Sequence, residues 1–424
     1  MLTIGLVILA LAPMRPEPWV GILGTGQSLS VGAEGWPIIS KEQKYGNLKL
    51  SSGELKWPVD SKDPALKLVP LVEPVGHRAP AYPSSWPQNI DGETPHSAMG
   101  NQISALSLSK FKTNLISVHC AIGESGQGIK YLKKGAPHDG VNGRSFESAL
   151  IATTAMTRMA KAEGRDFAIK GVIMTHGETD CGNYNYGQEL VQLLDDYRKE
   201  IKAITGQKDD FLMFITQQNS LLSRSPSTLF VWQLGVHHPD QFVCVGPKYQ
   251  YPYVKDQIHL SSKGYQLLGE KYGQVFFERV VLKRKWSPLQ PTKATQKGSQ
   301  IVLDFHVPVG PLSWDEKFSD IHQNHPQWSK GMGFEVVDGA GPVEIKSVSL
   351  GSNGKSVVVE CGRVLGHGAK VSYALYEESN KKLIGPERTN HAGALCDSDP
   401  FVGEGSRQRQ RNYCVAFELE LKQS

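Results

Sequence analysis

The chain has 424 residues, of which 39% are hydrophobic and 21% charged, and its formal net charge is +4. This composition is that of a globular protein and excludes extended disorder, and the length predicts two or three domains. Acidic and basic residues interleave along the chain without forming a basic stripe, so nucleic acid is not expected as a partner.

The first residues form a short apolar segment. Met1–Ala12 is shorter than the roughly 20 residues that cross a bilayer, and it ends in Ala10-Leu11-Ala12, a pattern typical of signal cleavage. We therefore expect residues 1–17 to be a signal segment of a periplasmic or extracellular protein. No basic residue precedes the run and Pro13 follows it, so a buried first strand is the alternative. No later apolar run approaches membrane length, and no membrane span is expected.

The six cysteines include no C-x-x-C pair, which argues against a structural zinc site. Cys396 and Cys414 would close a loop as a disulfide in an exported protein. His237-His238, with Asp240 close behind, is another candidate for metal chemistry. Because adjacent side chains diverge in regular structure, these residues are expected to be polar loop residues, and neither a metal nor a cofactor is expected.

Residues 18–284 alternate between short apolar runs and amphipathic segments, which predicts an α/β domain with a parallel sheet. The stretch Val31–Gly100 is rich in Gly, Pro, Ser and Trp and is expected to be an insertion or a long active-site loop region. The predicted strands are 19–23, 115–120, 169–175, 211–217 and 242–245, and the predicted helices are 146–162, 190–204 and 264–281.

Residues 285–424 have a different character. After a linker at 286–291, short runs with β character are separated by Gly and Asn turns, and no convincing helix intervenes. This pattern predicts a second, all-β domain, a sandwich. The predicted strands are 301–307, 334–337, 343–350, 357–361, 370–376 and 413–421.

The first motif that could carry chemistry is Gly24-Thr-Gly-Gln-Ser28, directly after the first predicted strand. A Gly-rich turn there would lift Ser28 above the sheet edge, where a nucleophile needs exposure and a base. The motif does not continue as a dinucleotide fingerprint, because Leu29 stands where the third Gly belongs. A serine with no role in chemistry is the other interpretation of this motif alone.

The second motif is Asp256-Gln-Ile-His259-Leu-Ser, just ahead of the last helix of the α/β domain. A carboxylate three residues before an imidazole can orient the ring and stabilise its charged form, which supplies the base that a serine lacks. By itself this spacing more often describes a turn cap and a satisfied polar histidine.

Two further loops follow the second and third predicted strands. Gly123–Gly128 offers backbone N–H groups, and His176-Gly177-Glu178-Thr-Asp180 offers polar side chains for an oxyanion or for holding the loop. The first of these is not a G-x-S-x-G elbow, because Gln127 stands where that pattern needs Gly.

Taken together, Gln27-Ser28, Gly126, Gly177-Glu178 and the D-x-x-H-L-S-x-x-G block that begins at Asp256 resemble the four blocks of the SGNH hydrolase superfamily. The closest branch is that of the sialate O-acetylesterase-like carbohydrate esterases. The resemblance covers about residues 19–283 and also reaches the β runs of the tail. It implies a flavodoxin-like three-layer α/β/α sandwich followed by the smaller β module.

The resemblance also implies roles. Ser28 would be the nucleophile, His259 the general base and acid, and Asp256 the residue that orients it. The oxyanion donors would be the N–H groups of Ser28 and Gly126 and a side chain of the third block. That branch usually has Gln where this chain has His176, whose protonation would make activity sensitive to pH. Gln27 and Glu178 belong to the same binding region, with Glu178 and Asp180 holding the loop.

The leading hypothesis is a secreted serine esterase that removes O-acetyl groups from a carbohydrate. The alternative is an inactive carbohydrate-binding protein on the same scaffold, in which Ser28 would not be hydrogen-bonded to His259. A sugar cleft could be lined by residues of the long loop region, or these aromatics could simply pin the loop to the core. The residues in question are His96 in the stretch 91–96 and Trp36, Trp57, Tyr82 and Trp86. The oligomeric state is left open.

Overall fold

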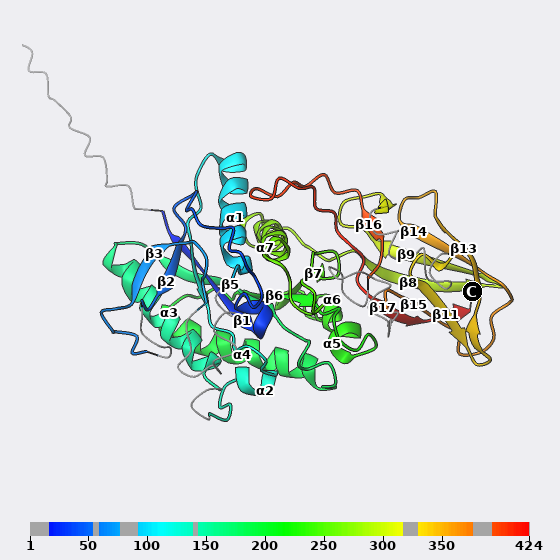
Figure 1. The fold of residues 1–424 in the computed structure, drawn as a ribbon, viewed down its shortest axis with the longest axis horizontal. Coiled ribbons are helices and arrows are strands. Elements are labelled where there is room, and N and C mark those ends of the chain that lie inside the picture. The colour runs from blue at the N-terminus through cyan, green and yellow to red at the C-terminus, as the bar shows by residue number, and fades with distance from the viewer. Residues whose placement is uncertain are drawn as a thin grey trace, which may run out of the picture.

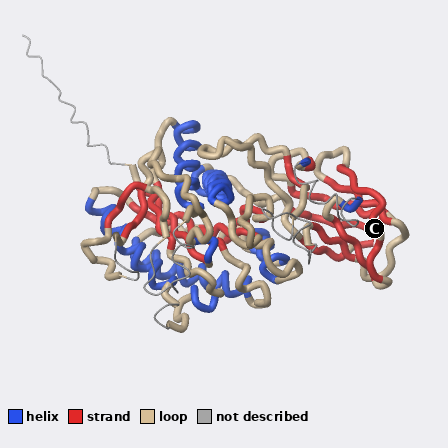
Figure 2. Tube along the Cα trace, viewed as in Figure 1, coloured by secondary structure: helices blue, strands red, loops and turns tan. Residues whose placement is uncertain are grey.

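The computed structural model describes residues 17–53, 59–76, 92–138, 143–316, 330–375 and 392–423. The signal segment expected at 1–17 therefore lies almost entirely outside the described residues, as do Trp57, Tyr82 and Trp86. An α/β half and a β-rich half lie side by side along the longest axis (Figures 1 and 2).

The α/β half is built on a seven-stranded sheet with the order β3-β2-β4-β1-β5-β6-β7. Within it, only the edge pair β2 and β3 is antiparallel, and the other pairings are parallel. The predicted α/β fold class is confirmed. The strands are β1 (Trp19–Gly26), β2 (Leu48–Ser51), β3 (Lys67–Pro70), β4 (Ser117–Ala121), β5 (Phe167–Thr175), β6 (Leu212–Gln217) and β7 (Phe242–Pro247).

Helices cover both faces of this sheet, which makes three layers (Figure 1). α1 (Pro95–Phe111) and α7 (Ser262–Phe276) pack together on one face, and α3 (Ser145–Ala162) and α4 (Tyr186–Thr205) lie on the other. The remaining helical pieces are short: η1 (Ser28–Ser30), α2 (Ile129–Leu132), α5 (Pro226–Leu229), η3 (Val231–Gln233), α6 (Leu234–His237) and η4 (Phe277–Val281). Among the described residues, no helix is long and apolar enough to cross a membrane.

The stretch Val31–Gly100 is more structured than expected. It contributes β2 and β3 to the sheet and the first turns of α1. The two strands are only four residues long, and α1 buries small polar residues such as Ser97 and Ser104 beside Met99. Such a helix is not recognised from the sequence, because buried serines interrupt the hydrophobic stripe that would show the helical period.

The strand order places the loops of interest at one edge. The chain passes from β1 to the edge strands β2 and β3, comes back to β4 beside β1, and then crosses to β5 on the opposite side of β1. This is the flavodoxin-like order, in which the loops that leave the first and third parallel strands diverge and open a crevice at the carboxyl ends. Ser28 follows β1 and His176 follows β5, so both lie at this switch point.

The β half contains two sheets that pack face to face, with the rings of Phe305 and Phe417 at a centroid distance of 6.2 Å between them. Their orders are β13-β14-β9-β8-β18 and β12-β11-β15-β17, and β10 pairs with β16. The strands are β8 (Gln290–Lys297), β9 (Gln300–His306), β10 (Leu312–Trp314), β11 (Phe334–Asp338), β12 (Gly341–Val343), β13 (Ile345–Leu350), β14 (Ser356–Cys361), β15 (Lys370–Tyr373), β16 (Leu395–Asp397), β17 (Phe417–Glu420) and β18 (Lys422–Gln423).

Residues 398–416, here called the C-terminal strap, extend from the β half over α7 toward α1 (orange to red in Figure 1). The Glu270 carboxylate on α7 accepts hydrogen bonds from the N–H groups of Gly405 and Ser406 at 2.9 and 2.5 Å. Next to it, the buried Lys271 Nζ donates to Asn412 Oδ1 at 3.0 Å. The strap therefore joins the two halves through polar contacts with α7.

The expected disulfide between Cys396 and Cys414 is wrong: both thiols are free and buried. Cys396 and Tyr413 form an isolated antiparallel β-bridge. Because successive residues of a strand point to opposite faces, Cys414 lies on the face away from Cys396. The Cys396 sulfur instead contacts Ser313 and Arg411.

Candidate active site

Ser28 stands at a sharp turn where β1 ends. Gly26 has φ +132°, and a Cβ there would lie 2.3 Å from the Thr175 carbonyl oxygen, so this position requires glycine. Gln27 is extended, and Ser28 begins the single turn η1. The serine is thereby lifted from the strand end into the crevice at the switch point.

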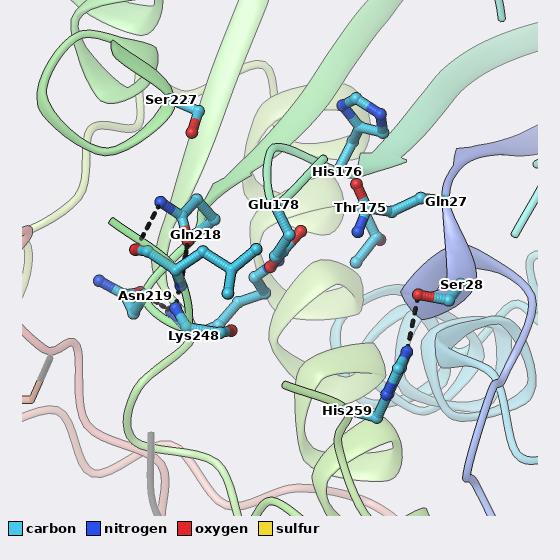
Figure 3. A network of polar contacts seen from close by, with 12 residues as sticks. Gln27, Ser28, Thr175, His176, Glu178, Gln218, Asn219, Ser227, Lys248 and His259 are labelled. Carbon is cyan, nitrogen blue, oxygen red and sulfur yellow. Dashed lines mark hydrogen bonds and ion pairs between the residues drawn. The ribbon is translucent and has the colours of Figure 1, made fainter. Parts of the chain in front are cut away.

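Ser28, His259 and Asp256 form a chain of hydrogen bonds (Figure 3). His259 Nε2 is 2.8 Å from Ser28 Oγ, and His259 Nδ1 is 2.6 Å from Asp256 Oδ2. An ionised carboxylate only accepts, so the proton lies on Nδ1. The Nε2 of the neutral ring therefore accepts from the Ser28 hydroxyl, which is the direction that proton removal requires.

The Asp256 carboxylate is prepared for this role. Its Oδ1 accepts hydrogen bonds from the N–H groups of Ile258 at 2.8 Å and His259 at 2.9 Å. Partial burial acts to raise the pKa of Asp256, but hydrogen bonds from the His259 side chain and from these two N–H groups outweigh it and hold the pKa below its usual value. The carboxylate therefore stays ionised at neutral pH and fixes the ring.

Two backbone N–H groups are available for an oxyanion. The N–H groups of Ser28 and Gly126 form no hydrogen bond within the described parts of the chain. The Gly126 loop is tied to the serine turn, because the Glu124 N–H donates to the Gly26 carbonyl oxygen at 2.9 Å. Preorganised donors of this kind stabilise the charge that develops on a carbonyl oxygen during acyl transfer.

Gln27 links the serine turn to the loop after β5. Its Oε1 accepts a hydrogen bond from the Thr179 N–H at 3.1 Å. Gln27 is buried, and no described residue accepts a hydrogen bond from its Nε2. The amide can therefore hold the loop with one end and present a donor with the other.

His176 is placed differently from the expectation that it donates to the oxyanion. Its Nε2 lies 3.0 Å from the carbonyl oxygen of Gln127, and its Nδ1 lies 2.9 Å from the Tyr186 hydroxyl. A carbonyl only accepts, so Nε2 carries the proton and the Tyr186 hydroxyl donates to Nδ1. Both ring nitrogens are occupied, and the ring points away from Ser28 in Figure 3. The imidazole joins two loops instead.

This burial predicts how His176 responds to pH. Burial lowers the pKa of His176, so the folded protein keeps the ring neutral while the unfolded chain protonates it near pH 6.5. Its contribution to stability is complete above pH 6.5 and declines as the pH falls below that value. We expect His176→Gln to lower the free energy of unfolding by about 1–3 kcal/mol at pH 7.5 and by less at pH 5. Urea unfolding at both pH values measures this, and an equal loss at each would contradict it.

Glu178 forms an ion pair with Lys248, a residue that none of the sequence motifs identified. Its Oε1 lies 2.5 Å from Lys248 Nζ, and both side chains are almost fully buried (Figure 3). Lys248 follows β7 directly, so a charged residue at the end of an apolar strand was the signal that could have identified it. The ion pair joins the loops after β5 and β7, and no described residue pairs with Glu178 Oε2.

Other expected site residues lie elsewhere. His96 is fully buried on α1, and a Cβ on Gly24 would lie 2.0 Å from its Nε2, so the expectation that it lines the cleft is wrong. Trp86 lies outside the described residues. His237 and His238 end α6 and lie on the surface. Within the described ranges, no group of three or more His, Cys, Asp or Glu residues could hold a metal ion.

Comparisons with known proteins bear on the fold. No family model matches the chain, and no curated protein is similar to it in sequence. A carbohydrate acetylesterase from Xanthomonas citri is similar in structure, with a TM-score of 0.55, 13% identity and coverage of 94% of this chain and 80% of that one. NanS has a TM-score of 0.40 and 13% identity over 63% of this chain and 98% of its own. The similarity to the Xanthomonas citri protein shows that the two chains share a fold.

Proposed function

We propose that this protein is a serine esterase that removes O-acetyl groups from a carbohydrate through an acetyl-enzyme intermediate. The observation that carries the proposal is the hydrogen-bonded series of Asp256, His259 and Ser28, together with the N–H groups of Ser28 and Gly126, which have no partner among the described residues. The resemblance of the four sequence blocks to SGNH hydrolases and the fold shared with a carbohydrate acetylesterase support the acetyl group and the sugar.

The proposed reaction follows from these positions. Ser28 Oγ attacks the acetyl carbonyl carbon, His259 Nε2 takes the hydroxyl proton, and the N–H groups of Ser28 and Gly126 bind the oxyanion. When the intermediate collapses, the bond from the carbonyl carbon to the sugar oxygen breaks and His259 protonates that oxygen. Water then attacks the acetyl-serine, His259 accepts the water proton and returns it to Ser28, and acetate leaves.

An inactive carbohydrate-binding protein is the alternative. That function requires no link between the serine and the imidazole, whereas Ser28 and His259 are hydrogen-bonded at 2.8 Å. The hydrogen bond therefore favours the enzyme.

Acetate release tests the proposed function. We expect the purified protein to hydrolyse p-nitrophenyl acetate and to release acetate from at least one acetylated sugar in a panel of sialic acids, xylan, pectin and bacterial polysaccharides. The longer p-nitrophenyl octanoate serves as the control for acyl length. If no acetyl ester is hydrolysed, the esterase is contradicted. If only the aryl ester is hydrolysed, the serine mechanism is supported and the carbohydrate substrate is contradicted.

A further inference from the structure

The loop that carries Gly126 is a tight turn whose first residue is Glu124. The Gln127 N–H donates to the Glu124 carbonyl oxygen at 3.2 Å, which closes the turn. Gly126 has φ +74°, the positive value that a type II turn requires at its third residue. The N–H of that third residue takes no part in closing the turn, so it stays available to a ligand. The placement of Glu124 therefore fixes the direction of the Gly126 N–H.

On one side, the backbone of Glu124 is attached to the serine turn. Its N–H donates to the Gly26 carbonyl oxygen at 2.9 Å. The two segments lie so close that a Cβ on Gly123 would come within 2.7 Å of the same oxygen. The two N–H groups available for an oxyanion, on Ser28 and Gly126, thus belong to two turns in direct contact.

On the other side, the start of α3 captures the Glu124 carboxylate. Oε1 accepts a hydrogen bond from the Arg144 N–H at 2.6 Å, and Oε2 accepts one from the Gly143 N–H at 3.0 Å. The Arg144 side chain forms no capping hydrogen bond with α3, so Glu124, 20 residues earlier in the chain, takes the place of a cap. The partial positive charge of a helix N-terminus favours a carboxylate there.

The start of α3 is itself fixed to the sheet. The Ser145 hydroxyl donates to the Ile122 carbonyl oxygen at 2.7 Å and lies 3.1 Å from the Thr25 hydroxyl on β1. Arg144 Nε lies 4.0 Å from Glu124 Oε1, and both side chains are only 5% exposed. Because this attachment excludes water and its base is held by β1, a displaced carboxylate moves the turn and not the helix.

We propose that Glu124 is a positioning residue for the oxyanion donors: its carboxylate, held at the start of α3, directs the Gly126 N–H toward the carbonyl oxygen of the substrate. The inference rests on the proposed esterase function, because it concerns the charge that develops during acyl transfer. It goes further by giving a role in transition-state geometry to a residue outside the series of Asp256, His259 and Ser28. Glu124 acts only through the turn and does not touch the reacting atoms.

The test uses Glu124→Gln, which keeps the shape of the side chain. An amide has one acceptor oxygen, so its NH₂ group must face one of the two N–H groups of α3, and the attachment is lost there. Burial raises the pKa of Glu124, and hydrogen bonds from the Arg144 and Gly143 N–H groups oppose that rise, so assays are run at about pH 8, where the carboxylate is ionised.

The readout compares p-nitrophenyl acetate with p-nitrophenyl thionoacetate, in which sulfur replaces the carbonyl oxygen. Sulfur is a weak acceptor, so only the oxygen ester gains fully from the N–H donors. We expect Glu124→Gln to lower kcat for p-nitrophenyl acetate by about ten- to hundred-fold, with KM within about three-fold of the wild type. The ratio of kcat/KM for the oxygen ester to that for the sulfur ester should fall about ten-fold. Inhibition by a trifluoromethyl ketone, whose adduct with Ser28 carries the same oxyanion, should weaken similarly.

Glu270→Gln provides the matched control. The Glu270 carboxylate also accepts two backbone N–H groups, those of Gly405 and Ser406, but it holds the C-terminal strap. Its replacement should destabilise the protein and leave the oxygen-to-sulfur ratio unchanged, as expected of a purely structural carboxylate. An equal fall for both esters in Glu124→Gln would give Glu124 the same structural role.

Every outcome of this test decides between the two proposals. An active wild-type enzyme whose oxygen-to-sulfur ratio is unchanged in Glu124→Gln overturns the positioning role alone. If Glu124→Gln does not fold, Glu124→Asp, which keeps the charge and withdraws it by one methylene, is measured in its place, and an unchanged ratio there overturns the role equally. Absence of p-nitrophenyl acetate hydrolysis by the wild type contradicts the esterase and, with it, the inference that rests on it.

Discussion

Replacement of Ser28 by Ala is expected to lower kcat for p-nitrophenyl acetate by about 10⁴- to 10⁶-fold, the loss typical of removing a nucleophile from a hydrogen-bonded triad. The substitution deletes one oxygen atom and leaves the N–H groups of Ser28 and Gly126 in place. Residual catalysis from those donors should persist. An organophosphate that labels active serines should add its mass to the wild-type chain and not to Ser28→Ala.

The control for this prediction is Ser30→Ala in the same turn. The Ser30 hydroxyl donates to the Gln27 carbonyl oxygen at 2.6 Å, so its loss should cost about 1 kcal/mol of stability and keep activity within about ten-fold. Because a triad acts as a unit, Ser28→Ala combined with His259→Ala should be no slower than Ser28→Ala alone. A Ser28→Ala protein within ten-fold of wild-type activity would remove Ser28 from the mechanism.

Breaking the buried ion pair between Glu178 and Lys248 is expected to have the largest effect on stability. Lys248→Met leaves the Glu178 carboxylate buried without its cation, and such losses cost about 3–5 kcal/mol. The pair also supports the loop that carries Thr179, which holds Gln27 next to Ser28. We therefore expect kcat to fall as well. Chemical denaturation and p-nitrophenyl acetate turnover measure the two effects.

A surface ion pair provides the matched control. Lys134 Nζ and Glu200 Oε1 are 2.6 Å apart, close to the 2.5 Å of the buried pair, but their side chains are 44% and 30% exposed. Lys134→Met should leave the stability close to that of the wild type, because water screens an exposed ion pair. Adding Glu178→Gln to Lys248→Met should recover part of the loss, because the uncompensated charge is gone. Equal effects at the two lysines would show that burial is not the cause.

The apolar runs predicted the central strands well because strands buried on both faces consist almost entirely of Val, Ile, Phe and Leu. β5 was expected at 169–175 and spans Phe167–Thr175, and β6 was expected at 211–217 and spans Leu212–Gln217. The helix α1 was not predicted because it buries serines and small residues against the sheet. Long-range packing, which decides that burial, leaves no periodic pattern in the chain.

The motifs placed Ser28, Asp256 and His259 in a single site because each follows or precedes an element whose end faces the same sheet edge. What could not be read from spacing was the partner of each remaining polar group. His176 turns toward Gln127 and Tyr186, and Glu178 toward Lys248, 70 residues away. Such pairings depend on the rotation of side chains within the assembled loops, which residue order does not encode locally.

The C-terminal strap also has a consequence for the order in which the protein is made. α7, which begins just after His259, emerges from the ribosome well before residues 405–412. Until those residues arrive, Glu270 lacks the four donors of the strap and Lys271 lacks its Asn412 partner. The helix behind the imidazole is therefore completed by a part of the chain that is synthesised well after it. Hydrolytic competence should consequently appear only after the strap has been translated.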